Sequence, residues 1–230
     1  MIKNEKIYAN SLVVPFVLFL VLGMVESQGL GGTLTYPLAY SIKILLVGIL
    51  CLCCWRYWVR LFPLQVTGKT ALALVLGVLC TALWVGLAAV PVTNPFMNTE
   101  TARAAFDPFA AENGLSTALA WGFWAIRMIG LVLVVPLIEE VFLRGFLLRW
   151  VQGGDWMELG IGVMTPLAWI VLVFYAVATH PEIIAAIVWF SLVTLYVCKT
   201  RNLWDAVAFH IGTNAGLGLW VLFSGQWGLM

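Results

Sequence analysis

Charged residues are scarce in this sequence. They make up 10% of the 230 residues, whereas hydrophobic residues make up 63%. A soluble domain has about a quarter charged residues and about half apolar ones, and a chain of this length cannot bury so much apolar surface inside a globule. The composition therefore excludes an ordinary soluble protein and predicts one that is largely surrounded by lipid.

The sequence also lacks a block of basic residues and any cysteine spacing typical of a metal site. The net charge is +1, and without a basic cluster we expect no nucleic-acid partner. The cysteines follow neither a disulfide framework nor a zinc-knuckle pattern, and we interpret them as small buried hydrophobic residues. They are Cys51, Cys53, Cys54, Cys80 and Cys198.

Long apolar runs are what the sequence does contain. A transmembrane helix needs about 20 such residues, and the runs predict seven spans, or eight if the longest run forms two pieces. They lie at approximately 8–25, 37–55, 70–90, 118–149, 162–179, 182–198 and 204–223. The predicted fold class is all-α, a polytopic bundle of transmembrane helices that makes a single integral membrane domain of residues 1–230.

The basic residues predict how this bundle is oriented. They gather before the first span, between the second and third, at the end of the fourth, and between the sixth and seventh. Because such residues favour the cytoplasmic side, we expect a multi-pass protein of the plasma (inner) membrane with a cytoplasmic N-terminus. Segments 26–36 and 91–117 would be external, the second as a loop that can hold a short interfacial helix. Lys43, within the second span, is interpreted as snorkelling towards an interface.

Two adjacent glutamates stand within the fourth run, in the stretch PLIEEVFLRGFLLR at 136–149. Charges inside a membrane are costly and usually functional. Glu140 and Arg144 are four residues apart, so they share a helix face and can pair. Glu139 is rotated by about 100° from Glu140 at 3.6 residues per turn. The spacing predicts one glutamate that is neutralised by Arg144 and one that stays available for chemistry.

The sequence has only two histidines, and both lie in its C-terminal half. His210 and Asn214, in AFHIGTNAGLG, are four residues apart and can direct donors at the same place. The glycines of this stretch permit a neighbouring backbone or a substrate to approach closely; they are Gly212, Gly216 and Gly218. A plainer interpretation is that the two polar side chains join helices by hydrogen bonds.

His180 stands at the end of the fifth predicted span and is followed by Pro181, so we expect the helix to end there. Hydropathy places this turn at the outer surface, away from Glu139 and His210. One common site would therefore require the 162–198 hairpin to be shallow or its turn to dip into the bilayer. Either arrangement requires a hydrated cavity there. As a lone histidine at a span end, it is also open to interpretation as an interfacial residue.

Together these residues resemble the CAAX protease and bacteriocin-processing family of intramembrane glutamic endopeptidases. EEVFLR at 139–144 matches that family's EExxxR motif, and HIGTN at 210–214 matches its HxxxN motif. His180 corresponds to the histidine of the middle motif, although Ala176 stands where the family often has Phe. The resemblance covers approximately residues 118–223, as the family-like catalytic core, and extends to a branch found with bacterial exopolysaccharide and exosortase systems.

The resemblance implies an intramembrane endopeptidase that hydrolyses a peptide bond of a membrane-associated protein or peptide. Glu139 would be the catalytic carboxylate, and His180 would help it to activate water. His210 and Asn214 would stabilise the oxyanion of the tetrahedral intermediate. The second glutamate and its arginine would support the site. The implied enzyme needs no cofactor, and its partners are membrane lipid and the membrane-associated substrate.

Three alternatives stay open from the sequence. Glu139, His180 and His210 are sufficient for a two-histidine, one-carboxylate zinc site, so a zinc-dependent intramembrane metalloprotease is the nearest. The same groups would serve a proton-coupled transporter as a proton relay. A non-catalytic membrane scaffold that has kept the motifs is the third.

Overall fold

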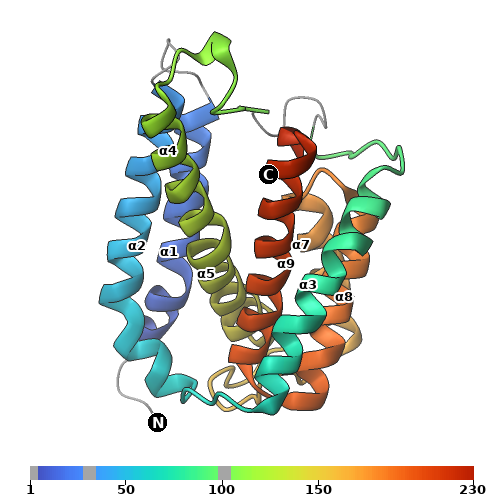
Figure 1. Ribbon diagram of the computed structural model, residues 1–230. Coiled ribbons are helices and arrows are strands. Elements are labelled where there is room, and N and C mark those ends of the chain that lie inside the picture. Colours follow the sequence, from blue (N-terminus) through green and yellow to red (C-terminus); the bar gives the residue numbers. More distant parts are fainter. Residues whose placement is uncertain (1–4, 28–34, 98–104) are drawn as a thin grey trace.

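A computed structural model describes residues 5–27, 35–97 and 105–230, and these residues form a bundle of helices without a strand among them. The elements are α1 (Glu5–Ser27), α2 (Thr35–Leu61), α3 (Gly68–Ala88), η1 (Ala111–Asn113), α4 (Thr117–Ile129), η2 (Gly130–Val134), α5 (Val135–Phe142), η3 (Leu143–Leu147), α6 (Leu148–Trp150), α7 (Pro166–Thr179), α8 (Ile183–Thr200), α9 (Leu203–Ser224) and η4 (Trp227–Leu229). The all-α prediction is confirmed. Figure 1 shows α1, α2, α4 and α5 on one side and α3, α7, α8 and α9 on the other, and α5 contacts α9 where the two groups meet.

Five of the described helices are long and apolar enough to cross a membrane, namely α1, α2, α3, α8 and α9. The predicted span 118–149 is one continuous helical rod over residues 117–150, interrupted by the π-helical turns η2 and η3. At 1.5 Å per residue the rod is about 50 Å long, which exceeds the hydrocarbon thickness of about 30 Å. The total of seven or eight spans stays a prediction.

The two π turns lie on either side of α5, the segment that carries both glutamates. Such turns are rare in helices and occur frequently at functional sites. A π turn widens the helix by one residue and so changes which side chains share a face. The position of the two turns places the EExxxR motif in the least regular part of the rod.

Helix α7 is short, with 14 residues. It begins where the Thr165 side chain accepts the N–H of Ala168 and Pro166 occupies the first turn, which are typical start signals. It ends before His180, whose backbone is extended (φ −131°, ψ 132°), as predicted from Pro181. A helix of this length rises only about 21 Å, so the following turn lies less far along the bundle than a full span would place it.

Helices α3 and α9 pack with their backbones in contact. A Cβ atom added to Gly77 would lie 2.0 Å from the main-chain oxygen of Phe209, and one added to Gly212 would lie 2.2 Å from that of Leu74. No larger side chain fits at either position. The close approach predicted for Gly212 is confirmed, and it sets the position of α9 and its HxxxN motif against α3.

Lys43 has an ionic partner close to the end of the neighbouring helix α1. Its side chain is buried between α1 and α2, where it forms an ion pair with Glu26. The ammonium group also lies over the rings of Phe19 and Tyr40, 4.8 and 4.7 Å from their centroids. The charge is therefore neutralised within the helix pair, and the lysine joins α1 to α2.

The predicted external segments are described only in part. Residues 28–34 and 98–104 lie outside the described residues, so most of segment 26–36 is not covered. Within 105–116 the chain forms a loop that contains one short 3₁₀ helix, η1. Asp107 organises this loop, since its main-chain oxygen accepts the Asn113 side chain and its carboxylate accepts the N–H of Phe109.

Candidate active site

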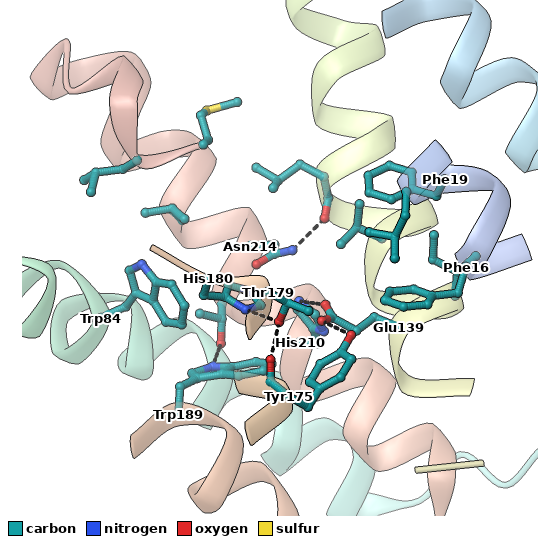
Figure 2. A pocket seen from close by; sticks show the side chains of 18 residues that line it. Phe16, Phe19, Trp84, Glu139, Tyr175, Thr179, His180, Trp189, His210 and Asn214 are labelled. Carbon is teal, nitrogen blue, oxygen red and sulfur yellow. Dashed lines mark hydrogen bonds and ion pairs between the residues drawn. The ribbon is translucent and has the colours of Figure 1, made fainter. Parts of the chain in front are cut away.

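One cavity between the two groups of helices brings together the four residues predicted to be catalytic. Its volume is about 230 Å³, and Glu139 from α5, His180 after α7, and His210 and Asn214 from α9 all line it. Figure 2 shows these side chains around one space, with aromatic residues on two sides. Much of the remaining lining is apolar and includes Phe16, Phe19, Leu131, Val135, Ile138 and Leu217. The short α7 ends at the cavity, so His180 lines it together with Glu139 and His210.

Glu140 and Arg144 form the predicted pair. The two side chains make an ion pair on the rod, and Glu140 is completely buried. Nη2 of Arg144 also donates to the main-chain oxygen of Phe190 and to Oγ1 of Thr194, each at 3.1 Å. A buried ion pair needs further hydrogen bonds to offset the cost of its desolvation, and α8 supplies them. The pair thus neutralises one glutamate and fixes the rod to α8.

Glu139 takes its contacts from other helices. Its Oε1 accepts a hydrogen bond of 2.6 Å from the hydroxyl of Tyr175 on α7. Its Oε2 lies 3.8 Å from Nε2 of His210 on α9. Only 5% of the residue is exposed, and the carboxylate borders the cavity. One of its oxygens is thus held in place, and the other faces a histidine.

His210 lies between the two glutamates. Its Nδ1 is 3.0 Å from Oε1 of Glu140, and because Glu140 is paired with Arg144 as a carboxylate, it can only accept. The proton of this hydrogen bond therefore belongs to Nδ1. The ring of Trp189 packs edge-on against the imidazole, with 4.6 Å between the centroids. These contacts fix the plane of the imidazole and direct Nε2 towards Glu139.

His180 is held beside the cavity by aromatic rings and by its backbone. Its imidazole packs edge-on against Trp84 and Phe190, with centroids 5.6 and 5.1 Å away. Its main-chain oxygen accepts a hydrogen bond of 2.8 Å from Asn94. Nδ1 is 2.8 Å from Oγ1 of Thr179. Both histidines therefore reach the cavity with one ring nitrogen already engaged by a neighbour.

Asn214 donates from Nδ2 to the main-chain oxygen of Leu131, at 2.7 Å. Leu131 lies in the π turn η2, where the donor to its carbonyl would be the residue five places later. That residue is Pro136, which has no N–H. Asn214 replaces the missing donor and still has a second amide hydrogen, since the side chain carries two. The proline thus explains why the asparagine is tied to the rod beside the cavity.

Sequence reasoning missed Tyr175 as a partner of Glu139 and did not consider Thr179. Tyr175 stands directly before Ala176, within the predicted span 162–179. A tyrosine within an apolar span was nevertheless a signal, because a buried hydroxyl usually has a hydrogen-bond partner. The identity of that partner depends on which helices are neighbours, which the sequence alone does not give.

The three residues of the zinc alternative all line the cavity without forming a ready-made metal site. Across the ranges 5–27, 35–97 and 105–230, no three His, Cys, Asp or Glu side chains gather closely enough to hold a metal ion. Nδ1 of His210 is directed at Glu140, and Nδ1 of His180 at the hydroxyl of Thr179. These two ring nitrogens therefore take part in hydrogen bonds within the protein and are not directed at a common metal position.

No curated protein and no solved structure is significantly similar to the chain. A family model does match, that of the Rce1-like type II CAAX prenyl endopeptidases, over residues 120–216. This region includes the EEVFLR motif, His180 and the HIGTN motif, and it excludes α1 to α3. Members of the family are intramembrane endopeptidases, which agrees with the apolar helices of an integral membrane protein. The match over residues 120–216 supports the resemblance of this part of the chain to the CAAX protease family.

Proposed function

We propose that this intramembrane endopeptidase cuts a membrane-associated protein or peptide with a water molecule activated by Glu139. The observation that carries the proposal is the setting of that carboxylate. Oε1 is held by Tyr175, and Oε2 faces the cavity 3.8 Å from Nε2 of His210. A general base must lie within hydrogen-bond reach of the proton that it removes, and Oε2 is the oxygen that a water in the cavity can reach.

The reaction follows from this placement. Glu139 takes a proton from water while the water oxygen attacks the carbonyl carbon of the scissile bond. The electron pair of the carbonyl moves to its oxygen and gives a tetrahedral oxyanion. When the intermediate collapses, the C–N bond breaks, and the proton passes from Glu139 to the leaving nitrogen. The carboxylate is thereby restored for the next turnover.

The oxyanion would be stabilised from α9. Asn214 has a second amide hydrogen, and its orientation is set by Leu131. In its protonated form, His210 can donate from Nε2 because Nδ1 already donates to Glu140. Donors that are fixed before the reaction need no reorganisation when charge develops. His180 lines the same cavity and would help Glu139 to activate the water.

The supporting pair has an electrostatic purpose in this scheme. An uncompensated carboxylate at position 140 would repel the developing oxyanion. Arg144 cancels that charge, and Glu140 then serves to orient His210. The family core thus combines one reactive glutamate with one that sets the position of a histidine.

We further propose that the substrate presents an apolar segment to the cavity, because much of the lining is apolar. Under the positive-inside rule, the enzyme lies in the plasma (inner) membrane with its N-terminus in the cytoplasm. Labelling of single-cysteine variants from each side of intact membranes would test this orientation.

The central experiment compares cells that carry wild type, Glu139→Gln or Glu112→Gln. Glu112 is an exposed carboxylate in η1 and serves as the matched control. We expect membrane proteins to accumulate uncut with Glu139→Gln alone, and the purified wild type in liposomes to cut the accumulated protein. If the same peptide termini occur in all three strains, the cavity does not perform peptide hydrolysis.

A further inference from the structure

The last turn of α7 and the residue after it contribute three polar side chains to the cavity. Tyr175, Thr179 and His180 all line it. Tyr175 and Thr179 are four residues apart and therefore lie on one face of the helix. Figure 2 shows that this face is directed at Glu139 and at His180.

The packing of the Tyr175 ring fixes the position of its hydroxyl group. The side chain is buried, and its ring packs on Phe190 and Phe142, with centroids 5.5 and 6.3 Å away. Its hydroxyl is 2.6 Å from Oε1 of Glu139. Since a carboxylate only accepts, the tyrosine is the donor. The ring has little room to move, so the hydroxyl fixes one oxygen of Glu139 and with it the direction of the other.

The proton on His180 can be assigned from the hydroxyl of Thr179. Oγ1 of Thr179 lies 2.7 Å from the main-chain oxygen of Tyr175. Two oxygen atoms at this distance need a proton between them, and the hydroxyl is the group that has one. Oγ1 must then be the acceptor in its 2.8 Å contact with Nδ1 of His180. A neutral His180 therefore carries its proton on Nδ1, and Nε2 is the acceptor nitrogen.

We propose that Tyr175 and Thr179 are the positioning residues of the reaction, Tyr175 for the orientation of Glu139 and Thr179 for the tautomer of His180. The inference rests on the proposed function. Tyr175 holds Oε1 of Glu139, and Thr179 makes Nδ1 the protonated nitrogen of a neutral His180. A carboxylate in one orientation and a histidine in one tautomer leave less to reorganise when the reaction begins.

The kinetic test uses four variants with the membrane protein that accumulates uncut in Glu139→Gln cells as substrate. Tyr175→Phe and Thr179→Val should each lower kcat by about tenfold or more with little change in KM, since misplaced reacting groups slow the chemical step. Thr179→Ser keeps the hydroxyl and should restore most of the rate. Tyr196→Phe is the matched control, because that partly buried side chain donates to the main-chain oxygen of Lys69, away from the cavity.

A second measurement does not depend on activity. The chain has two histidines, so ¹⁵N spectra of histidine-labelled protein are simple, and His210→Gln assigns the remaining signal to His180. We expect the Nδ1-protonated tautomer in wild type and in Thr179→Ser. Thr179→Val should shift the population towards the Nε2-protonated tautomer. Melting temperatures of the same samples identify any variant that does not fold.

The outcomes separate the two proposals. Activity that survives in Glu139→Gln would overturn the proposed function whatever the other variants show. An inactive Glu139→Gln with full activity in Tyr175→Phe and Thr179→Val would overturn the positioning roles alone. An Nε2-protonated His180 in folded wild type would refute the role of Thr179 even if no substrate were found.

Discussion

Glu139 and Glu140 are neighbours in the sequence, yet their carboxylates are held by different helices. Glu140 is bound by Arg144 on its own rod and by His210, whereas Glu139 is held by Tyr175 from α7 and faces Nε2 of His210. This division arises because adjacent residues of a helix point about 100° apart. One carboxylate is built into the ionic support of the bundle, and the other borders the cavity.

Exchanging each glutamate for glutamine should separate these roles. Glu139→Gln should abolish turnover and leave the melting temperature unchanged, because it removes the base and keeps the shape. Glu140→Gln leaves Arg144 buried without its counter-charge, which typically costs about 3–5 kcal/mol of stability. Thermal unfolding followed by tryptophan fluorescence, together with turnover, measures both effects. Equal loss of activity with equal melting temperatures would contradict this division.

The contact of α3 with α9 should be intolerant of a single methyl group. In Gly77→Ala the new Cβ would lie 2.0 Å from the oxygen of Phe209, so α9 must move and carry its motif with it. We expect a lower melting temperature and reduced turnover. Gly48→Ala is the control, since a Cβ there meets nothing within 4 Å and alanine favours helix by about 1 kcal/mol. A Gly77→Ala protein as stable as Gly48→Ala would show that α3 and α9 are not in close contact at Gly77.

Asn94 should be needed to hold the end of α7. Its Nδ2 donates to the main-chain oxygens of Val177 and His180, at 2.9 and 2.8 Å. In Asn94→Ala both carbonyls lose this donor, and a buried polar group without a partner costs about 1–3 kcal/mol. We expect a lower melting temperature and slower turnover through displacement of His180. Asn10→Ala, on an exposed face of α1, is the control, and equal behaviour of the two variants would exclude this role.

Local rules predicted much of this site because they depend on residues close in sequence. Four-residue spacing predicted the ion pair of Glu140 with Arg144, Pro181 predicted the end of α7, and small size predicted the close packing of Gly212. Each needs only the geometry of one helix. The motifs therefore predicted the four residues proposed to be catalytic, but not Tyr175, which holds Glu139.

Hydropathy could not give the length of α7 or the partners that cross between helices. Residues 151–165 form a loop, and the buried side chain of Arg149 organises it by donating to the main-chain oxygens of Leu159 and Met157, at 2.7 and 2.9 Å. Mean hydropathy registers Arg149 only as a charged residue at the end of a span. It gives no indication that this side chain organises the loop that follows. The pairing of Tyr175 with Glu139 likewise depends on long-range packing, which has no local signature.

Removing the side chain of Asn214 tests the oxyanion assignment. Asn214→Ala deletes the amide that is tied to Leu131 and should lower turnover by about 10²-fold or more, as the loss of one oxyanion donor typically does. Leu131→Ala keeps the carbonyl acceptor and the amide, so it controls for changes in packing at η2. A loss of affinity without a loss of kcat in Asn214→Ala would assign the residue to substrate binding instead.

Asn214→Asp distinguishes the glutamate mechanism from a zinc mechanism. A carboxylate at this position would repel the oxyanion, so in the glutamate mechanism the variant should be inactive. In a zinc mechanism the new carboxylate could join Glu139 and the histidines as a ligand and retain or tighten metal binding. We expect chelators to leave wild-type activity intact and Asn214→Asp to be inactive and free of metal, as measured by elemental analysis of purified protein. Stoichiometric zinc that is lost together with activity on chelation, and restored together with it, would establish the metal mechanism.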